Sequence, residues 1–403
     1  MSSPLRSALA GMAVLALALG VGRFAFTPLL PLMQAAGLSL VDGGWLASIN
    51  NVGYMLGALA CIALSLPQRP ALRGGVLLLA LATLGMGLTI SLPLWMLCRF
   101  AAGVAAALLM VHGVAWCTAR LRTQRRTGLE SLLFSGPGIG VAVTGALVAA
   151  IHGPTMDAAR WWLVFGVLTA LVAVPLWRPL AAPENAATTT TAAGSGQRGT
   201  PWPLVLIYAL LGFSYIIPAI FLPLIADAQL HMPALREWFW PLYGVAAMLT
   251  TWLVGALPAP RSNYAGLALC LLSQLLGILL CLYRPRLDSL LLGTVLLGAM
   301  SMPSVMFTMR EANQLAGRHP TRLIGTLTVA FGIGQIAGPM VAATLATHHH
   351  GFDAPLELAA LATAIALLTA LVIVRRRSPR PAGEKLPEKG AEEVNKLIGR
   401  STY

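Results

Sequence analysis

Two arginines, Arg23 and Arg99, stand inside long apolar stretches of the sequence. A charged side chain near the centre of a membrane-spanning helix costs about 2.5 kcal/mol at least, so such residues usually face a bundle interior or an aqueous cavity. A guanidinium group fits a carboxylate or phosphate in a bidentate manner. All 14 Asp and Glu residues fall in loops, tails or the ends of apolar stretches. The two arginines therefore predict a positively charged interior suited to an anionic or zwitterionic organic molecule.

Other polar side chains occur at similar depths, counted with a helical rise of about 1.5 Å per residue. The level in the outer half of the membrane contains Arg23, Asn50, Asn51 and Arg99, and the level nearer the midplane contains Tyr54, Tyr215, Gln274 and Gln335. We predict substrate contacts from Arg23, Asn50, Asn51, Tyr54, Tyr215 and Gln335. Because Asn50 and Asn51 are adjacent on a helix, only one of them can face a cavity.

A structural role for the arginines is the alternative. Both lie within reach of the outer membrane interface, where long cationic side chains extend to water, and Asp42 could neutralise either. Titratable groups available for proton coupling are few: Asp42, Asp227, Glu237, Glu130, Glu311 and His112. We assign Arg99, Asp42 and Glu130 to coupling or gating. The five cysteines have no CxxC spacing, and no metal or cofactor is expected.

The composition is that of an integral membrane protein. Hydrophobic residues make up 57% and charged residues 10% of the 403 residues, and the mean hydropathy is +0.76. The chain has room for about twelve spans of about 20 residues. Hydropathy predicts them near 8–32, 43–66, 72–92, 93–118, 129–151, 160–177, 203–225, 237–257, 264–283, 288–309, 322–346 and 354–374.

The net charge of +13 arises mainly from Lys and Arg at the ends of the spans. The positive-inside rule then places both termini in the cytoplasm, and no nucleic-acid partner is expected.

A polar segment, 178–202, separates six spans from six. Its Thr, Ala, Gly and Ser content predicts a flexible cytoplasmic linker between bundles at 1–177 and 203–374, with a mostly disordered cytoplasmic tail at 375–403. The repeated dipeptides Gly136–Pro137 and Gly338–Pro339 lie in the fifth and eleventh spans, as expected for two related halves that enclose a site. With Gly140 they predict a kinked, closely packed seam with a role in gating, or plain packing.

Three segments resemble the YbfB-like bacterial group of the major facilitator superfamily: GVGRFAFTPLLP at 20–31, GWLASINNVGY at 44–54 and GFSYIIP at 212–218. Arg99 with Gly103 resembles the motif of the fourth helix, although Ala102 replaces its usual Gln. Gly136-Pro137-x-x-Gly140 resembles the "antiporter" motif of the fifth helix. The loop motif after the second helix has Gln68 in place of Asp. The resemblance implies an all-α integral membrane protein with twelve transmembrane helices in two pseudo-symmetric six-helix bundles.

The expected function is a secondary active transporter of a small organic anion or zwitterion, working by alternating access in the bacterial inner membrane, with protons as a candidate coupling ion. The chain is expected to act as a monomer in the lipid bilayer. The alternative is a polyspecific, proton-coupled exporter of amphipathic or drug-like compounds, to which the aromatic residues Trp238, Trp240, Tyr243 and Trp252 would contribute unless they form a belt at the membrane interface. A membrane enzyme or sensor is disfavoured because the sequence has no HExxH motif, Cys/His cluster or nucleophile elbow.

Overall fold

The computed structural model describes residues 4–64, 66–151, 156–177, 201–230, 233–256, 262–284, 286–315 and 320–377. Within these ranges the regular structure is helical, with no strand. The linker predicted at 178–202 and the tail predicted at 375–403 lie almost entirely outside the described residues.

The N-terminal half begins with three consecutive helical segments that form one span. Its elements are α1 (Pro4–Leu15), the π-helical η1 (Ala16–Phe24), α2 (Phe26–Ala35), α3 (Leu40–Ala63), α4 (Gln68–Leu88), α5 (Leu92–Thr123), the short 3-10 helix η2 (Thr127–Leu129), α6 (Glu130–Ala150) and α7 (Ala158–Trp177). The elements of the C-terminal half are α8 (Trp202–Leu230), the short α9 (Pro233–Arg236), α10 (Phe239–Ala256), α11 (Asn263–Tyr283), α12 (Leu287–Leu315), α13 (Pro320–His348) and α14 (Asp353–Arg377).

In the part of the chain that the structure describes, eleven helical stretches are long and apolar enough to cross a membrane, and α10 contributes a shorter apolar helix. Together they confirm the predicted fold of twelve transmembrane helices. Several helices extend past the predicted spans: α5 covers Leu92–Thr123, whereas hydropathy predicted 93–118. Hydropathy detects the part of a helix that lies in hydrocarbon, and backbone hydrogen bonding continues beyond it into the polar turn that contains Arg120 and Arg122.

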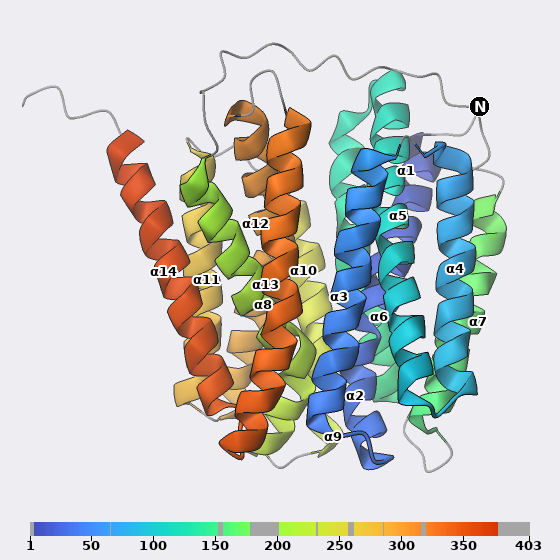
Figure 1. Cartoon of the computed structure of the whole chain (residues 1–403). Helices are drawn as coiled ribbons and strands as arrows, with labels where there is room; N and C mark the ends of the chain where they lie inside the picture. The colour runs from blue at the N-terminus through green and yellow to red at the C-terminus, as the bar shows by residue number, and fades with distance from the viewer. Residues whose placement is uncertain are drawn as a thin grey trace, which may run out of the picture.

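The two halves stand side by side (Figure 1), with the blue-to-green helices of the first half on one side and the yellow-green-to-red helices of the second on the other. They meet where α6 packs on α10 and where α3 packs on α13. Glycines allow the close approach: a Cβ on Gly138 of α6 would collide with the backbone of Met248, and one on Gly44 of α3 would collide with Pro339.

The Gly–Pro dipeptides occupy related places in the two halves. Gly136 and Gly140 of α6 pack against the first span of their own half, with Gly140 beside Gly20 of η1. Gly338 of α13 packs in the same way against Ile216 of α8, the first helix of the second half. The fifth helix of each half thus contacts the first, as expected for an internal repeat.

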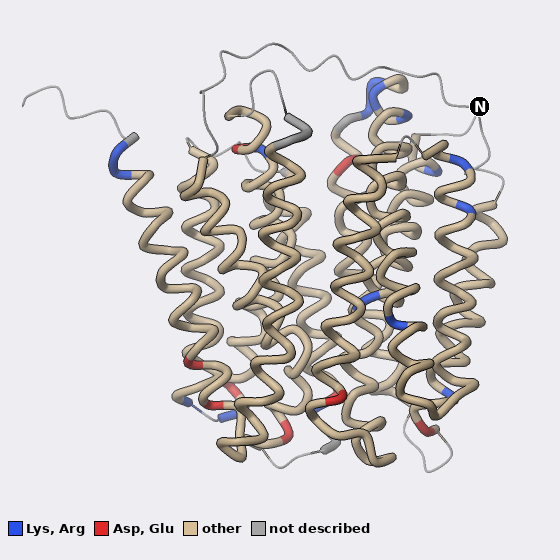
Figure 2. The backbone as a smooth tube through the Cα atoms, viewed as in Figure 1, with Lys and Arg blue, Asp and Glu red and all other residues tan. Residues whose placement is uncertain are grey.

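Charged side chains gather at the two ends of the helices (Figure 2). We call the end where α1 begins the basic face; it includes Arg6, Arg69, Arg73, Arg120, Arg122, Arg125, Arg126, Arg375 and Arg376. We call the opposite end the acidic face; it includes Asp42, Asp157, Asp227, Asp288 and Asp353. Arg23 and Arg99 are 5% and 1% exposed and lie between the faces.

Candidate functional site

The backbone around Arg23 departs from α-helical geometry. Residues Ala16–Phe24 form a π-helix, whose hydrogen bonds span one more residue than those of an α-helix and which occurs often at functional sites. Pro28 follows in α2 and has no N–H to donate to the preceding turn. Carbonyl groups of this segment therefore need donors from elsewhere.

Arg99 supplies several of these donors. Its Nη2 donates to the carbonyl of Arg23 at 3.2 Å, its Nη1 to that of Gly22 at 3.5 Å, and its Nε to that of Leu46 at 3.3 Å. Its guanidinium also lies over the ring of Phe26, 4.8 Å from the centroid. Arg99 therefore binds the backbone of η1 and α3, and it is not among the residues that line the cavity described below.

Asn50 acts with Arg99. Its Nδ2 donates to the carbonyls of Gly22 at 3.0 Å and Arg99 at 2.8 Å, and the side chain is 1% exposed. We predicted substrate contact for Asn50, but its amide is engaged within the N-terminal half and it does not line the cavity. The adjacent Asn51, about 100° further round the helix, faces Arg23 instead.

Arg23 lies where the two halves meet. Its Nη2 donates to Asn51 Oδ1 at 2.6 Å and to Gln335 Oε1, in the other half, at 3.0 Å. The guanidinium carbon is 4.3 Å from the centroid of the Tyr54 ring and 5.4 Å from that of Phe24. These partners are neutral, so they solvate the cation without cancelling its charge.

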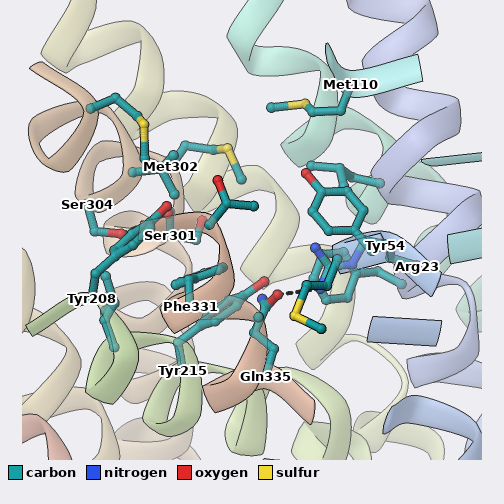
Figure 3. A pocket seen from close by; sticks show the side chains of 18 residues that line it. Arg23, Tyr54, Met110, Tyr208, Tyr215, Ser301, Met302, Ser304, Phe331 and Gln335 are labelled. Carbon is teal, nitrogen blue, oxygen red and sulfur yellow. Dashed lines mark hydrogen bonds between the residues drawn. The ribbon is translucent and has the colours of Figure 1, made fainter. Parts of the chain in front are cut away.

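A cavity of about 230 Å³ lies next to Arg23, between the halves (Figure 3). Its polar lining consists of Arg23, Tyr54, Tyr208, Tyr215, Ser301, Ser304, Thr328 and Gln335. Its apolar lining consists of Leu19, Phe24, Met55, Met110, Leu211, Met302, Val305, Met309, Phe331 and Gly332. No Asp, Glu or His is among these residues.

Two buried hydrogen-bond donors of the cavity lining are unused, whereas the hydroxyl groups of Ser301, Ser304 and Thr328 donate to carbonyls of their own helices. Arg23 Nε and Gln335 Nε2 are buried and have no protein partner in the described structure. The hydroxyl groups of Tyr54, Tyr208 and Tyr215 point into the same space (Figure 3). A ligand rich in acceptor oxygens matches such a lining, because a buried donor left without an acceptor costs about 1–3 kcal/mol.

Four hydrogen bonds join the halves at the level of Arg23 or nearer the acidic face, and we call them the latch. They are Thr27 Oγ1 to the Ala219 carbonyl (3.0 Å), Ser48 Oγ to the Ile336 carbonyl (2.7 Å), Asn51 Nδ2 to the Gln335 carbonyl (2.7 Å) and Arg23 Nη2 to Gln335 Oε1 (3.0 Å). The cavity extends from this level towards the basic face, where Met110, Tyr208 and Met309 lie. The latch closes it towards the acidic face.

The remaining predicted residues lie away from the cavity. Asp42 lies at the beginning of α3 and accepts a hydrogen bond from Ser39 Oγ at 2.6 Å. Within the described residues it forms no hydrogen bond or ion pair with Arg23 or Arg99. Glu130 is the first residue of α6, at the basic face. Gln274 Nε2 donates to Ser214 and Thr363 and so joins three helices of the C-terminal half.

Of the four aromatic residues for which an interface belt was the alternative to a role in an exporter, two are buried and cannot belong to a belt. Trp240 and Tyr243 are 0% and 5% exposed, with ring centroids 5.0 Å apart, and Trp240 also contacts Phe24. They are buried because α10 packs against α6 next to η1. Trp238 and Trp252 are 48% and 55% exposed, as a belt requires.

Depth counting missed Tyr208 and Phe331, whose rings stack with centroids 4.4 Å apart. Phe331 also stacks on Tyr215, at 6.2 Å. The seven-residue spacing of Tyr208 and Tyr215 places both on one helical face and could have indicated the first of them. Nothing in the sequence distinguishes the methionines of the cavity from packing residues.

Comparisons with known proteins agree with this architecture. A relative described as a chloramphenicol resistance protein of Streptomyces lividans is 27% identical over an alignment of 398 positions, gaps included; the alignment covers 89% of this chain and 94% of the relative. Three solved structures share the fold. The human organic anion transporter MFSD10 (TETRAN) is 17% identical with a TM-score of 0.62, covering 90% of this chain and 99% of that one.

The nucleoside transporter NupG is 11% identical with a TM-score of 0.70, covering 92% and 100%. A bacterial homologue of the human lysosomal transporter Spinster, in an inward-facing and occupied conformation, is 15% identical with a TM-score of 0.68, covering 95% and 100%. The family model described as "Uncharacterised MFS-type transporter YbfB" matches residues 15–371. This chain therefore belongs to the YbfB family of major facilitator superfamily transporters and is a multi-pass membrane protein.

Proposed function

We propose that the protein is a secondary active transporter that moves a small organic anion or zwitterion across the bacterial inner membrane by alternating access. The observation that carries this proposal is the Arg23 guanidinium, which borders a cavity whose lining includes no carboxylate. A buried cation without a counter-charge is costly, and an anionic ligand would lower that cost through charge-assisted hydrogen bonds.

The position of Arg23 also supports alternating access. Because Arg23 bonds Gln335 across the halves, a ligand held there contacts both bundles at once. A site between related halves is the arrangement around which such bundles rock. Opening towards the acidic face would require the latch to break and the halves to close near Tyr208 and Met309.

The charge distribution supports an orientation. The arginines of the basic face support a cytoplasmic location of that face, where α1 begins and α14 ends, under the positive-inside rule. The cavity would then open towards the cytoplasm in this conformation. Because its lining has no Asp, Glu or His, a coupled proton would travel on the substrate or use groups outside the cavity, such as Glu130.

A polyspecific exporter of amphipathic compounds is the second candidate. Four methionines and several aromatic rings line the cavity, and methionine side chains adapt readily to different apolar ligands. The similarity to a chloramphenicol resistance protein favours the same function.

Thermal unfolding of the purified protein with organic anions, amino acids, cationic dyes and chloramphenicol separates the two candidates. A ligand that binds only the folded state at 100 times its Kd stabilises it by about 2.7 kcal/mol, which is readily measured. We expect stabilisation by an anion or zwitterion that is lost in Arg23→Gln, weakened in Arg23→Lys and kept in Arg286→Gln. The control residue, Arg286, has a side chain that is 78% exposed.

Equal stabilisation of the wild type and Arg23→Gln by the same anion would contradict the proposal. Stabilisation by dyes or chloramphenicol alone would support the exporter.

A further inference from the structure

We propose that the substrate is an amphipathic monoanion, bound with its charged group at Arg23 and its apolar body extended towards the basic face. This inference rests on the proposed function and specifies the chemical class and orientation of the ligand.

The charged group is placed by two unused donors at one end of the cavity. Arg23 Nε and Gln335 Nε2 have no partner among the described residues of the protein, and the two residues are 5% and 2% exposed. They come from opposite halves and are held together by the bond from Arg23 Nη2 to Gln335 Oε1. The two oxygens of one carboxylate could accept from both donors.

A single negative charge is indicated because Arg23 is the only cationic residue in the lining of this cavity. A second anionic group would lie among methionine and aromatic side chains, where nothing balances it. Burying an unpaired charge in apolar surroundings is strongly unfavourable.

The apolar body is placed by the rest of the lining. Met110, Met302, Val305 and Met309 border the cavity, and none of them can form a strong hydrogen bond. Figure 3 shows Met110 and Met302 at the side of the cavity away from Gln335. The cavity therefore has its only cation at the closed end, and towards the basic face it has methionine and valine side chains with uncharged hydroxyl groups of Tyr208, Ser304 and Thr328.

The size of the cavity limits the length of the ligand. Tyr208 and Tyr215 both border it and are two helical turns apart, so it extends about 10 Å along α8. Its volume of about 230 Å³ is below the range of about 300–1,000 Å³ typical of drug-sized ligands. One aromatic ring joined by a short chain to a carboxylate matches these dimensions.

A matched set of ligands tests the inference by thermal unfolding of the purified full chain over a range of concentrations. 4-Phenylbutyrate has the proposed charge and body; 4-phenylbutanol and 4-phenylbutylamine change only the head group, butyrate lacks the ring, and (2-phenylethyl)malonate adds a second carboxylate. We expect phenylbutyrate to bind at least tenfold more tightly than each of the others. In Arg23→Gln, phenylbutyrate should no longer bind more tightly than phenylbutanol. Because the substitution does not change how either ligand partitions into detergent, it also controls for stability changes caused by that partition.

The orientation is tested separately at the apolar end. Met110→Gln should reduce the preference for phenylbutyrate over butyrate, whereas Met110→Leu should preserve it. Binding of butyrate through Arg23 as tight as that of phenylbutyrate would overturn the inference and leave the proposed function standing. Both the inference and the proposed function would be overturned if no ligand showed Arg23-dependent binding, whether phenylbutyrate, butyrate or any organic anion or zwitterion of the wider panel. If phenylbutanol bound as tightly as phenylbutyrate and its binding did not depend on Arg23, the inference would be overturned in favour of the exporter.

Discussion

Replacing Asn51 by alanine should shift the conformational equilibrium by weakening the latch. The substitution removes the 2.7 Å bond from Asn51 Nδ2 to the Gln335 carbonyl, which joins the halves directly. It also removes the 2.6 Å bond from Arg23 to Asn51 Oδ1, which orients Arg23 towards Gln335. Side-chain hydrogen bonds in membrane proteins contribute about 0.6 to 1.7 kcal/mol each, and the one bond that joins the halves directly sets the size of the effect. The population open towards the acidic face should rise about 3- to 20-fold.

The assay is the reaction of a cysteine placed in the latch with a membrane-impermeant maleimide. Ser48→Cys introduces the reporter at a side chain that is 1% exposed, in a protein whose native cysteines Cys61, Cys98, Cys117, Cys270 and Cys281 have been replaced. The reagent is added from the side of the acidic face. The labelling rate should increase in proportion to the open population when Asn51→Ala is added.

The neighbouring asparagine provides a matched control. Asn50 is equally buried and donates two hydrogen bonds, but both remain within the N-terminal half. Asn50→Ala should lower the thermal stability while leaving the labelling rate at Ser48→Cys unchanged. An unchanged rate in Asn51→Ala, or equal increases in both variants, would refute the assignment of a latch to Asn51.

Two further predictions concern the support of the π-helix. Arg99→Ala removes three hydrogen bonds to backbone carbonyls and should lower the unfolding free energy by about 2–5 kcal/mol. The thermal midpoint in detergent should fall accordingly, with Arg99→Lys intermediate between Arg99→Ala and the wild type. A midpoint of Arg99→Ala equal to that of the wild type would contradict this role. Gly140→Ala places a Cβ against the backbone of Ala16 and Gly20, so the thermal midpoint should fall, whereas Gly74→Ala, at a helical site with no heavy atom within 4 Å, should raise or maintain it. Equal midpoints for the two glycine variants would show that α6 does not need this close approach.

The fold was largely predictable because membrane helices are specified by length and hydropathy. The twelve helices and the family follow from those features and from the motifs around Arg23. The exact ends of α5 and α8 were not predictable. The apolar segment that hydropathy detects stops where charged or polar turns begin, whereas the helical backbone hydrogen bonds continue through those turns.

The site was only partly predictable, because depth along a helix does not fix the direction of a side chain. Counting residues put Arg23 at one level and Tyr54, Tyr215 and Gln335 at another, and all four line the cavity, whereas Asn51 and Gln274, assigned to the same two levels, do not. It could not choose between Asn50 and Asn51, which differ by about 100° around the helix. Nor could it recognise that Arg99 is occupied by carbonyl groups, because that role depends on the π-helical turn opposite.

The lack of acidic residues in the cavity lining has an electrical consequence. A carboxylate there could offset the charge of Arg23 or carry a proton through each transport cycle. Without such a carboxylate, a monoanion that crosses alone moves a full negative charge. A membrane potential of 100 mV, negative inside, contributes about 2.3 kcal/mol per charge, equivalent to a concentration ratio of about 50-fold. That ratio favours exit from the cell, so uptake of the same anion would need at least one accompanying cation merely to become electrically neutral.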